Sequence, residues 1–154
     1  MSEIKVVERE MTDAEFARMK AGFDEHTLEH GNPLQTYDRY GFVLMDDAVF
    51  LGCSSGIVYK NGAVCNGWFY LTDLFVEKPY RKQGFGAELL QTLEERVALL
   101  GVVHFLVVTA GYEAPGFYQK QGYRIVFEQE DYYATGHSRV MLHKTQVPAT
   151  LKEN

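Results

Sequence analysis

Residues 74–86 carry the strongest chemical signal in the chain and read Leu-Phe-Val-Glu-Lys-Pro-Tyr-Arg-Lys-Gln-Gly-Phe-Gly. Gly84 and Gly86 stand at the expected start of a helix, where the first backbone N–H groups have no partner within the helix and glycine leaves them uncovered. The helix dipole adds partial positive charge there, and Arg81 and Lys82 add full charges. The pattern predicts a pyrophosphate site, although a glycine-rich turn that merely enters a helix would have the same spacing.

Two common phosphate-binding signatures are absent from the sequence. There is no G-x-x-x-x-G-K-[ST] run, which excludes a P-loop. The stretch also lacks the complete G-x-G-x-x-G pattern, and no acidic residue follows a second strand at the spacing that a dinucleotide fold requires. Neither a P-loop nor a dinucleotide-binding fold is therefore expected.

The elements that position this stretch can be read from hydrophobic periodicity and turn signals. The expected strands are 5–9, 42–45, 48–59, 68–76, 102–109, 123–129 and 138–143. The expected helices are one that begins at a capping box of Thr12 and Glu15 and ends at Gly31, one over 85–100, and a short one from Pro115 to Gly122. Asn61-Gly62 predicts a hairpin turn, and residues 34–39 fit either a loop or a single turn.

The resulting order is β-α-β-β-β-α-β-α-β-β. Antiparallel neighbours come first and a parallel β-α-β crossover lies in the middle, which predicts a mixed α/β (α+β) fold. No repeat, linker or low-complexity segment interrupts the chain. We expect one domain over 1–144 and a weakly ordered tail over 145–154.

The composition limits the expected partners. The 154 residues are 46% hydrophobic and carry a formal net charge of −6. An acidic protein is a poor general binder of phosphate backbones, so nucleic acid is not an expected partner, whereas a cationic substrate is compatible with this charge. No apolar run approaches the roughly 20 residues of a membrane span. Cys53 and Cys65 suit reduced thiols, and with no signal-like N-terminus we expect a cytoplasmic location.

Two motifs, in this order, resemble those of the GNAT superfamily of N-acetyltransferases. Arg81-x-x-Gly84-x-Gly86 after a strand closely resembles the acetyl-CoA motif of that family. The four defined positions of its second signature, A-x-x-x-Y-x-x-x-G-[FY], are matched by Ala114, Tyr118, Gly122 and Tyr123. The run from Gly136 to Ser138, Gly-His-Ser, is similar to an element of small bacterial members. The resemblance extends from about residue 4 to 144.

The resemblance implies a fold with helices on both faces of a mostly antiparallel sheet, and acetyl-CoA as cosubstrate with no metal. Strands 68–76 and 102–109 would splay apart around the pantetheine arm, and a backbone N–H near Leu74 or Phe75 would stabilise the oxyanion. The residues implied to bind acetyl-CoA are Leu74, Phe75, Val76, Arg81, Lys82, Gln83, Gly84, Phe85 and Gly86. A homodimer is expected by analogy with the superfamily alone.

The same resemblance implies how protons move. Tyr118 would donate a proton to the leaving thiolate. The attacking amine has a pKa near 10 and must lose a proton, and many members place a glutamate at positions that here are Tyr70 and Thr72. Asp73 is the carboxylate within the strand, and Glu113 lies before the Tyr118 helix. We rank Asp73 first and Glu113 second as the general base, with base action through ordered water as an alternative.

Three functions are compatible with these residues. The first is transfer of the acetyl group of acetyl-CoA to a primary amine of a small, cationic molecule, with His137 a further residue that would face the acceptor. The second is an acyl-CoA sensor or degenerate member without turnover, which the missing strand glutamate leaves open. The third is acetylation of a protein amine. His26 and His30 have a metal-ligand spacing, but without a third ligand they suit a solvated helix face.

Overall fold

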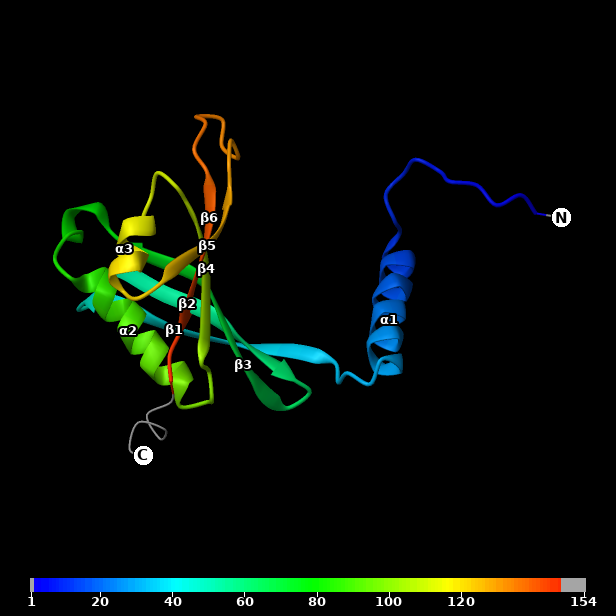
Figure 1. The fold of residues 1–154 in the computed structure, drawn as a ribbon, viewed down its shortest axis with the longest axis horizontal. Coiled ribbons are helices and arrows are strands. Elements are labelled where there is room, and N and C mark those ends of the chain that lie inside the picture. The colour runs from blue at the N-terminus through cyan, green and yellow to red at the C-terminus, as the bar shows by residue number, and fades with distance from the viewer. Residues whose placement is uncertain (1, 148–154) are drawn as a thin grey trace. The chain divides into compact units, whose positions relative to one another are not determined.

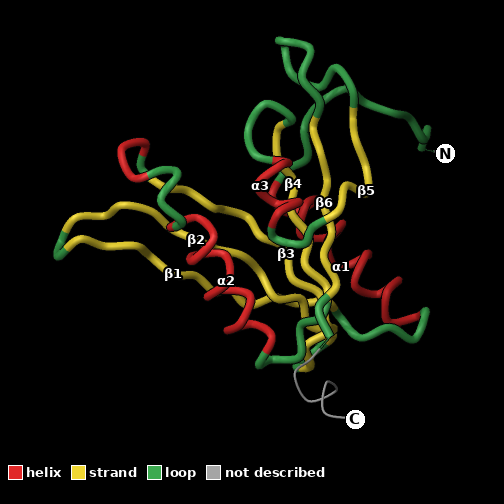
Figure 2. The backbone as a smooth tube through the Cα atoms, turned by 60° about the vertical axis from the view of Figure 1, so that its left-hand side comes forward, coloured by secondary structure: helices red, strands yellow, loops and turns green. Residues whose placement is uncertain are grey.

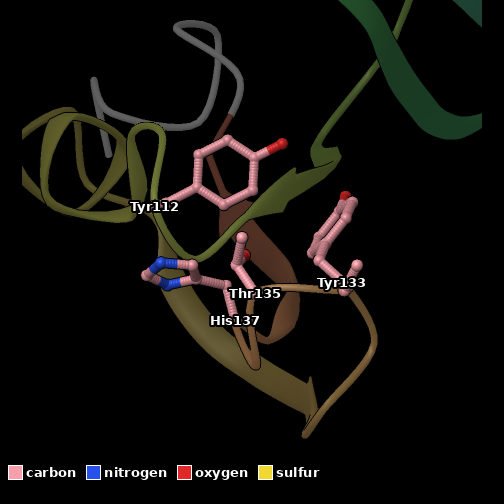
Figure 3. A pocket seen from close by; sticks show the side chains of 5 residues that line it. Tyr112, Tyr133, Thr135 and His137 are labelled. Atoms are coloured by element: carbon pink, nitrogen blue, oxygen red, sulfur yellow. The ribbon is translucent and has the colours of Figure 1, made fainter.

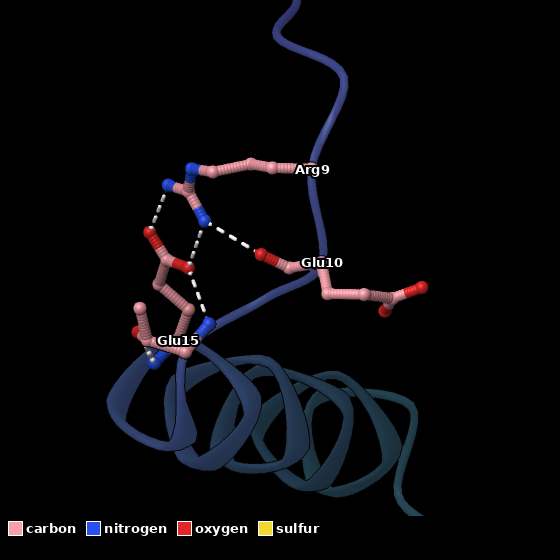
Figure 4. A network of polar contacts seen from close by, with 4 residues as sticks. Arg9, Glu10 and Glu15 are labelled. Atoms are coloured by element: carbon pink, nitrogen blue, oxygen red, sulfur yellow. Dashed lines mark hydrogen bonds and ion pairs between the residues drawn. The ribbon is translucent and has the colours of Figure 1, made fainter.

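The computed structural model describes residues 2–147, and the chain divides into two units, Met1–Leu34 and Gln35–Asn154 (Figure 1). In the first unit, α1 (Asp13–Glu29) begins with the predicted capping box, which is confirmed: the Glu15 N–H donates to Thr12 Oγ1 at 3.3 Å and the Thr12 N–H donates to Glu15 Oε2 at 2.8 Å. The Arg9 guanidinium also pairs with the Glu15 carboxylate at 2.7 Å (Figure 4). This pairing, with the Thr12 backbone N–H, lowers the pKa of Glu15 to about 2.

The predicted strand over 5–9 is wrong. Residues 2–12 form no strand, and the side chains of Ile4 and Val6 are fully exposed. A strand is stable only when a second strand pairs with it, and the described part of this unit contains none. The observed order of elements therefore begins with α1.

The second unit is built on a six-stranded sheet in the order β1-β2-β3-β4-β6-β5. Its strands are β1 (Gln35–Asp46), β2 (Val49–Asn61), β3 (Val64–Val76), β4 (His104–Ala110), β5 (Arg124–Gln129) and β6 (Arg139–Thr145). Its helices are α2 (Phe85–Ala98), α3 (Pro115–Lys120) and a short 3₁₀ turn (Lys78–Tyr80). All neighbouring strands are antiparallel except β3 and β4, so the mixed α/β (α+β) class is confirmed.

The strands before β4 are longer than the sequence predicts. Residues 35–39, which fit a loop or single turn from sequence, belong to β1 and pair with the far end of β2, in the register Gln35↔Asn61. β3 likewise begins at Val64, because the turn at Asn61 and Gly62 (φ +64°) folds it directly back on β2. Cross-strand pairing thus overrides a polar local composition.

The parallel contact between β3 and β4 is short. Four residue pairs join these strands, from Trp68↔His104 to Leu71↔Val107. Beyond Leu71, β3 is paired only with β2, and beyond Val107, β4 is paired only with β6. Figure 2 shows β1 and β2 running away from β4, β5 and β6. The sheet therefore opens between its two halves.

Aromatic side chains stack at the first pair of this contact. The Trp68 ring lies 4.3 Å from the His104 ring, nearly parallel to it. His104 Nδ1 is 3.1 Å from His143 Nε2, so a hydrogen bond links β4 to β6 there. Burial, followed by the neighbouring His104 and Arg124, lowers the pKa of His143.

One hydrophobic core unites the sheet with α2 and α3. Leu90, Leu93 and Val97 of α2 pack in the same cluster as Tyr118 of α3. The strand residues of this cluster are Val58, Phe69, Leu71, Phe105, Val107, Val140 and Leu142. α2 and α3 therefore cover the same face of the sheet (Figure 1), and helices on both faces stay a prediction, since α1 belongs to the other unit.

The weakly ordered tail is predicted over residues 145–154. Thr145, the first of these residues, is the last residue of β6, and residues 148–154 lie outside the described residues. The single domain over 1–144 stays a prediction. None of the helices in the described part of the chain combines the length and apolar character needed to cross a membrane.

Candidate active site

A cleft opens where β3 and β4 separate. Its volume is about 120 Å³. The lining residues come from both strands and from the segment that follows β4: Leu71, Thr72, Asp73, Leu74, Val107, Val108, Thr109, Glu113 and Tyr118. The cleft therefore contains Tyr118, Asp73 and Glu113, the three residues predicted to transfer protons. Their roles stay predictions.

A β-bulge aims Asp73. Ser55 pairs with Asp73, but the next residue of β2, Gly56, pairs with Leu71, so Thr72 is the extra residue on β3. In a regular strand the side chains of Thr72 and Asp73 would point to opposite faces of the sheet. The bulge changes the direction of the Asp73 side chain. Asp73 Oδ2 accepts a hydrogen bond from Thr72 Oγ1 at 2.7 Å and lies 3.9 Å from Arg39 Nη1.

Tyr118 combines a buried ring with a free hydroxyl. Its side chain is 6% exposed and packs edge-on against Phe117 and Tyr123. No described residue bonds to its hydroxyl, yet no described polar atom is both sealed from solvent and unpaired, so the hydroxyl opens on the cleft. Burial, and then the charge of Glu113, raises the pKa of Tyr118 to about 12. The phenol is therefore protonated at neutral pH.

Glu113 is fixed by the turn that leaves β4. Its backbone N–H donates to the Ala110 carbonyl at 2.9 Å, and its Oε2 accepts from Thr109 Oγ1 at 3.2 Å. The carboxylate is held at the cleft without a cationic partner among the described residues. It can accept a proton.

The loop before α2 forms a cradle of free backbone N–H groups. Gly84 is the N-cap and has φ +89°, and Lys82 also has positive φ, at +61°. Within the described residues, no carbonyl or side chain accepts a hydrogen bond from the amides of residues 82–87. Successive unpaired amides at a helix start are an anion site. We refer to residues 82–87 as the amide cradle.

A cavity of about 480 Å³ lies at this cradle. Its lining residues are Val76, Tyr80, Arg81, Lys82, Gly84, Gly86, Ala87, Phe117, Lys120 and Gln121. Arg81 donates through Nε to the Val76 carbonyl at 2.8 Å, which holds the guanidinium while its other two nitrogens stay free of described partners. Arg81, Lys82 and Lys120 make this cavity cationic in a chain whose net charge is −6.

The structure places the predicted cofactor residues in three settings. Val76, Arg81, Lys82, Gly84 and Gly86 line the cavity, and Leu74 lines the cleft. The other three line neither. The Phe75 ring is 40% exposed and stacks on Phe50, and the Gln83 side chain donates to the Pro79 carbonyl at 3.2 Å. Phe85 is the first residue of α2, and its N–H belongs to the amide cradle.

Lys120 is the cationic residue among the lining residues of this cavity that sequence reasoning misses. It lies two residues after Tyr118, within the second motif, so its position in sequence is unremarkable. Only the packing of α3 beside the start of α2, where Phe117 contacts the position of Gly86, turns Lys120 toward the cradle.

His137 lies outside both cavities. It lines a third pocket with Tyr112, Tyr133 and Thr135 (Figure 3). Across the described residues, no group of three or more His, Cys, Asp or Glu side chains is arranged to hold a metal ion. His26 and His30 of the first unit stack edge-on against each other.

Comparison with known proteins identifies the relatives of this chain. The family model described as "Acetyltransferase (GNAT) family" matches residues 5–123. L-ornithine N5-acetyltransferase NATA1 of Arabidopsis thaliana is 27% identical over 119 residues, covering 75% of this chain and 52% of that protein. Blasticidin-S acetyltransferase of Streptomyces morookaense is 35% identical over 66 residues, covering 42% of this chain and 48% of that protein. The chain spans about half the length of these curated relatives.

Solved structures share the fold. An acetyltransferase from Bacillus cereus superposes with a TM-score of 0.75 at 22% identity, covering 92% of this chain and 98% of the other. At this identity the likeness concerns the fold alone.

Proposed function

The chain belongs to the GNAT acetyltransferase family, and we propose that it transfers the acetyl group of acetyl-CoA to a primary amine of a small, cationic molecule. One observation carries this proposal: a cationic cradle of unpaired amides lies beside a cleft that holds an unpaired, protonated phenol and two carboxylates. A site that only bound an acyl-CoA would have no use for those proton-transfer groups.

The cradle suits the pyrophosphate of acetyl-CoA. The amides around Gly84 have no acceptor among the described residues, and Arg81, Lys82 and Lys120 add charge around them. Donors already in position lose little entropy when a phosphate binds. On the edge toward β4, the backbone of β3 beyond Leu71 has no strand partner. That edge suits the amide groups of the pantetheine arm.

The cleft residues then divide the chemistry. The amine nitrogen bonds to the thioester carbon, the C–S bond breaks, and Tyr118 supplies the proton that the departing thiolate takes up. We expect a backbone N–H of β3 near Leu74 or Phe75 to stabilise the oxyanion. Asp73 is our first choice to take the proton of the amine and Glu113 our second, directly or through ordered water.

The proposed acceptor class rests on charge and on the relatives. The two carboxylates of the cleft and the acidic chain favour a cation. The curated relatives are named for ornithine and blasticidin S, both small molecules that carry amines. A cytoplasmic location and a homodimer also remain proposals.

An amine panel tests the function. The protein is incubated with acetyl-CoA and polyamines, amino acids, aminoglycosides or peptides, and released CoA is measured with a thiol reagent. We expect amine-dependent release for small cationic amines above the rate for peptides. Acetyl-CoA binding without release for any amine would favour the sensor, and release for peptides alone would favour a protein substrate.

A further inference from the structure

An aromatic pocket lies beyond the cleft, and the proton transfers do not use it. Tyr112, Tyr133, Ala134, Thr135 and His137 line a space of about 480 Å³. Figure 3 shows His137 and Tyr133 on either side of Thr135, with Tyr112 above it. We refer to these five residues as the aromatic pocket. Its volume is that of a small-molecule site.

Backbone hydrogen bonds build this pocket from two loops. The Gly111 N–H, in the turn after β4, donates to the Ser138 carbonyl at 2.7 Å and so joins that turn to the loop between β5 and β6. Within the second loop, the Tyr133 N–H donates to the His137 carbonyl at 3.1 Å. Gly136, at φ +78°, permits this tight return of the chain.

The rings stand at steep angles to one another. The Tyr112 ring is 5.3 Å from that of Tyr133 at 73°, and 5.2 Å from that of His137 at 67°. An edge-to-face pair covers at most one face of one of its rings, and the aromatic faces that stay uncovered attract cations. The pocket therefore suits an organic cation better than a neutral group of equal size.

The lining residues carry no fixed positive charge that would repel the same occupant. No lysine or arginine lines the pocket. The nearby Arg139 guanidinium lies over the Tyr132 ring, 5.2 Å from its centre. The loop between β5 and β6 also contains Glu130 and Asp131.

The aromatic pocket and the cleft share one turn. Tyr112 lines the pocket and its neighbour in sequence, Glu113, lines the cleft. A molecule that presents an amine to the cleft can therefore place a second group against the rings.

We propose that the aromatic pocket binds a second, cationic group of the acceptor, so that the enzyme selects alkyl amines that carry another ammonium centre. This inference rests on the proposed acetyltransferase function and names the substrate class of that site. Tyr112 and Tyr133 determine specificity by attraction to the non-reacting cation.

Matched pairs of amines isolate the charge. One member is a primary alkyl amine that ends in a trimethylammonium group, and the other ends in the neutral, isosteric tert-butyl group, over a series of equal chain lengths. Each molecule has one reactive nitrogen. We expect wild-type protein to favour the charged member by about fivefold or more in kcat/KM at the best chain length.

Variants locate the preference. Tyr133→Leu and Tyr112→Leu should each remove most of it, whereas Tyr133→Phe, which keeps the ring, should retain it. Tyr37→Leu, at a β1 position that is 63% exposed, is the matched control and should behave as wild type. Acetyl-CoA affinity, measured by calorimetry, should stay unchanged in all four and shows that each variant is folded.

The results separate two failures. Turnover of both members at equal rates by wild-type protein rejects the aromatic pocket as a cation site and leaves the acetyltransferase function standing. A preference for the charged amine that survives in both leucine variants also rejects the aromatic pocket as a cation site, because another part of the protein must then cause the preference. Acetyl-CoA binding without turnover of any amine rejects the enzymatic function, and the acceptor class with it.

Discussion

The Tyr118 hydroxyl stays protonated because of where its ring is buried. Desolvation and the carboxylate of Glu113 both disfavour the phenolate, which raises the pKa from 10.0 to about 12. A phenol with this pKa is fully protonated at neutral pH. We propose that it passes its proton to the sulfur in concert with the breaking of the C–S bond.

Replacing Tyr118 by Phe tests this donor directly. We expect kcat to fall by about 10²-fold while acetyl-CoA affinity changes little, because the ring packing is kept and only the proton is lost. Steady-state kinetics and calorimetry measure the two quantities. Unchanged kcat would remove Tyr118 from the reaction.

The same variant has a predicted effect on alkaline stability. Because the folded pKa is raised, the neutral phenol contributes stability that is fully present below about pH 10 and is lost as pH rises through about 12. Tyr118→Phe should therefore lose less free energy of unfolding over that interval than wild type. Urea unfolding at a series of pH values measures this difference, and parallel curves would contradict it.

The amide cradle can be tested at Gly84. Its positive φ is tolerated by Asp and Asn better than by other residues. Gly84→Asp places a negative charge where we propose a pyrophosphate, so its Kd for acetyl-CoA should rise more than tenfold. Gly84→Asn is the matched control with the same shape and no charge, and its Kd should rise less. Equal affinities for both variants in calorimetry would mean that no anion binds there.

At the scale of elements, the bulge in β3 depends on a glycine in β2. A Cβ on Gly56 would overlap Cζ of Phe69 and would lie 2.5 Å from the Tyr70 carbonyl oxygen. Both neighbours belong to β3, and one is a fully buried ring. The two strands therefore approach closely just where Asp73 is re-aimed.

Gly56→Ala should destabilise the protein by about 1–3 kcal/mol through overpacking. Gly116→Ala is a control in α3, because a Cβ there meets no atom within 4 Å, and it should be neutral or stabilising by up to about 1 kcal/mol. Chemical denaturation measures both. Equal stability of the two variants would show that the strands can part without cost.

A buried ion pair ties α2 to β6. Glu94 is 3% exposed, accepts from the Tyr123 hydroxyl at 3.0 Å, and pairs with Lys144 Nζ at 3.0 Å. Burial raises the pKa of Glu94, and Lys144 partly offsets this. A raised pKa means that burying the carboxylate costs nothing below its ordinary value of 4.5 and costs more as pH rises.

Lys144→Met should accordingly destabilise the protein by about 3 kcal/mol at neutral pH, because it leaves a buried charge without its partner. The loss should shrink as pH falls toward about 4.5. Adding Glu94→Gln to Lys144→Met should remove most of this pH dependence. Thermal unfolding between these pH values measures it, and a pH-independent loss would show that only packing is affected.

The parts predictable from sequence are those that local pattern determines. The apolar stripe of α2 and the glycines at its start are patterns of residues close together in sequence. Both the helix and the amide cradle can therefore be predicted from the sequence. Whether a strand finds a partner is not local, which explains both the missing strand over 5–9 and the unforeseen pairing of residues 35–39. Lys120 and the aromatic pocket escape prediction because helix packing and the joining of two loops place them.

At the scale of the whole molecule, the sheet consists of two halves joined by four residue pairs. A ligand that bridges the halves should stabilise the folded state by mass action. With acetyl-CoA at about 100 times its Kd, the free energy of unfolding should rise by about 2.7 kcal/mol, which corresponds to a Tm shift of roughly 5–10 °C. Differential scanning fluorimetry measures it. A full shift with Gly84→Asp would contradict binding at the cradle.

The stacking of Trp68 on His104 gives the protein an optical reporter of its own. The chain has one tryptophan, and it lies at the first pair of the short contact between the two halves. Its emission depends on the distance of the imidazole stacked on it. Intrinsic fluorescence can therefore follow any movement of the halves in solution, with no label and no substitution.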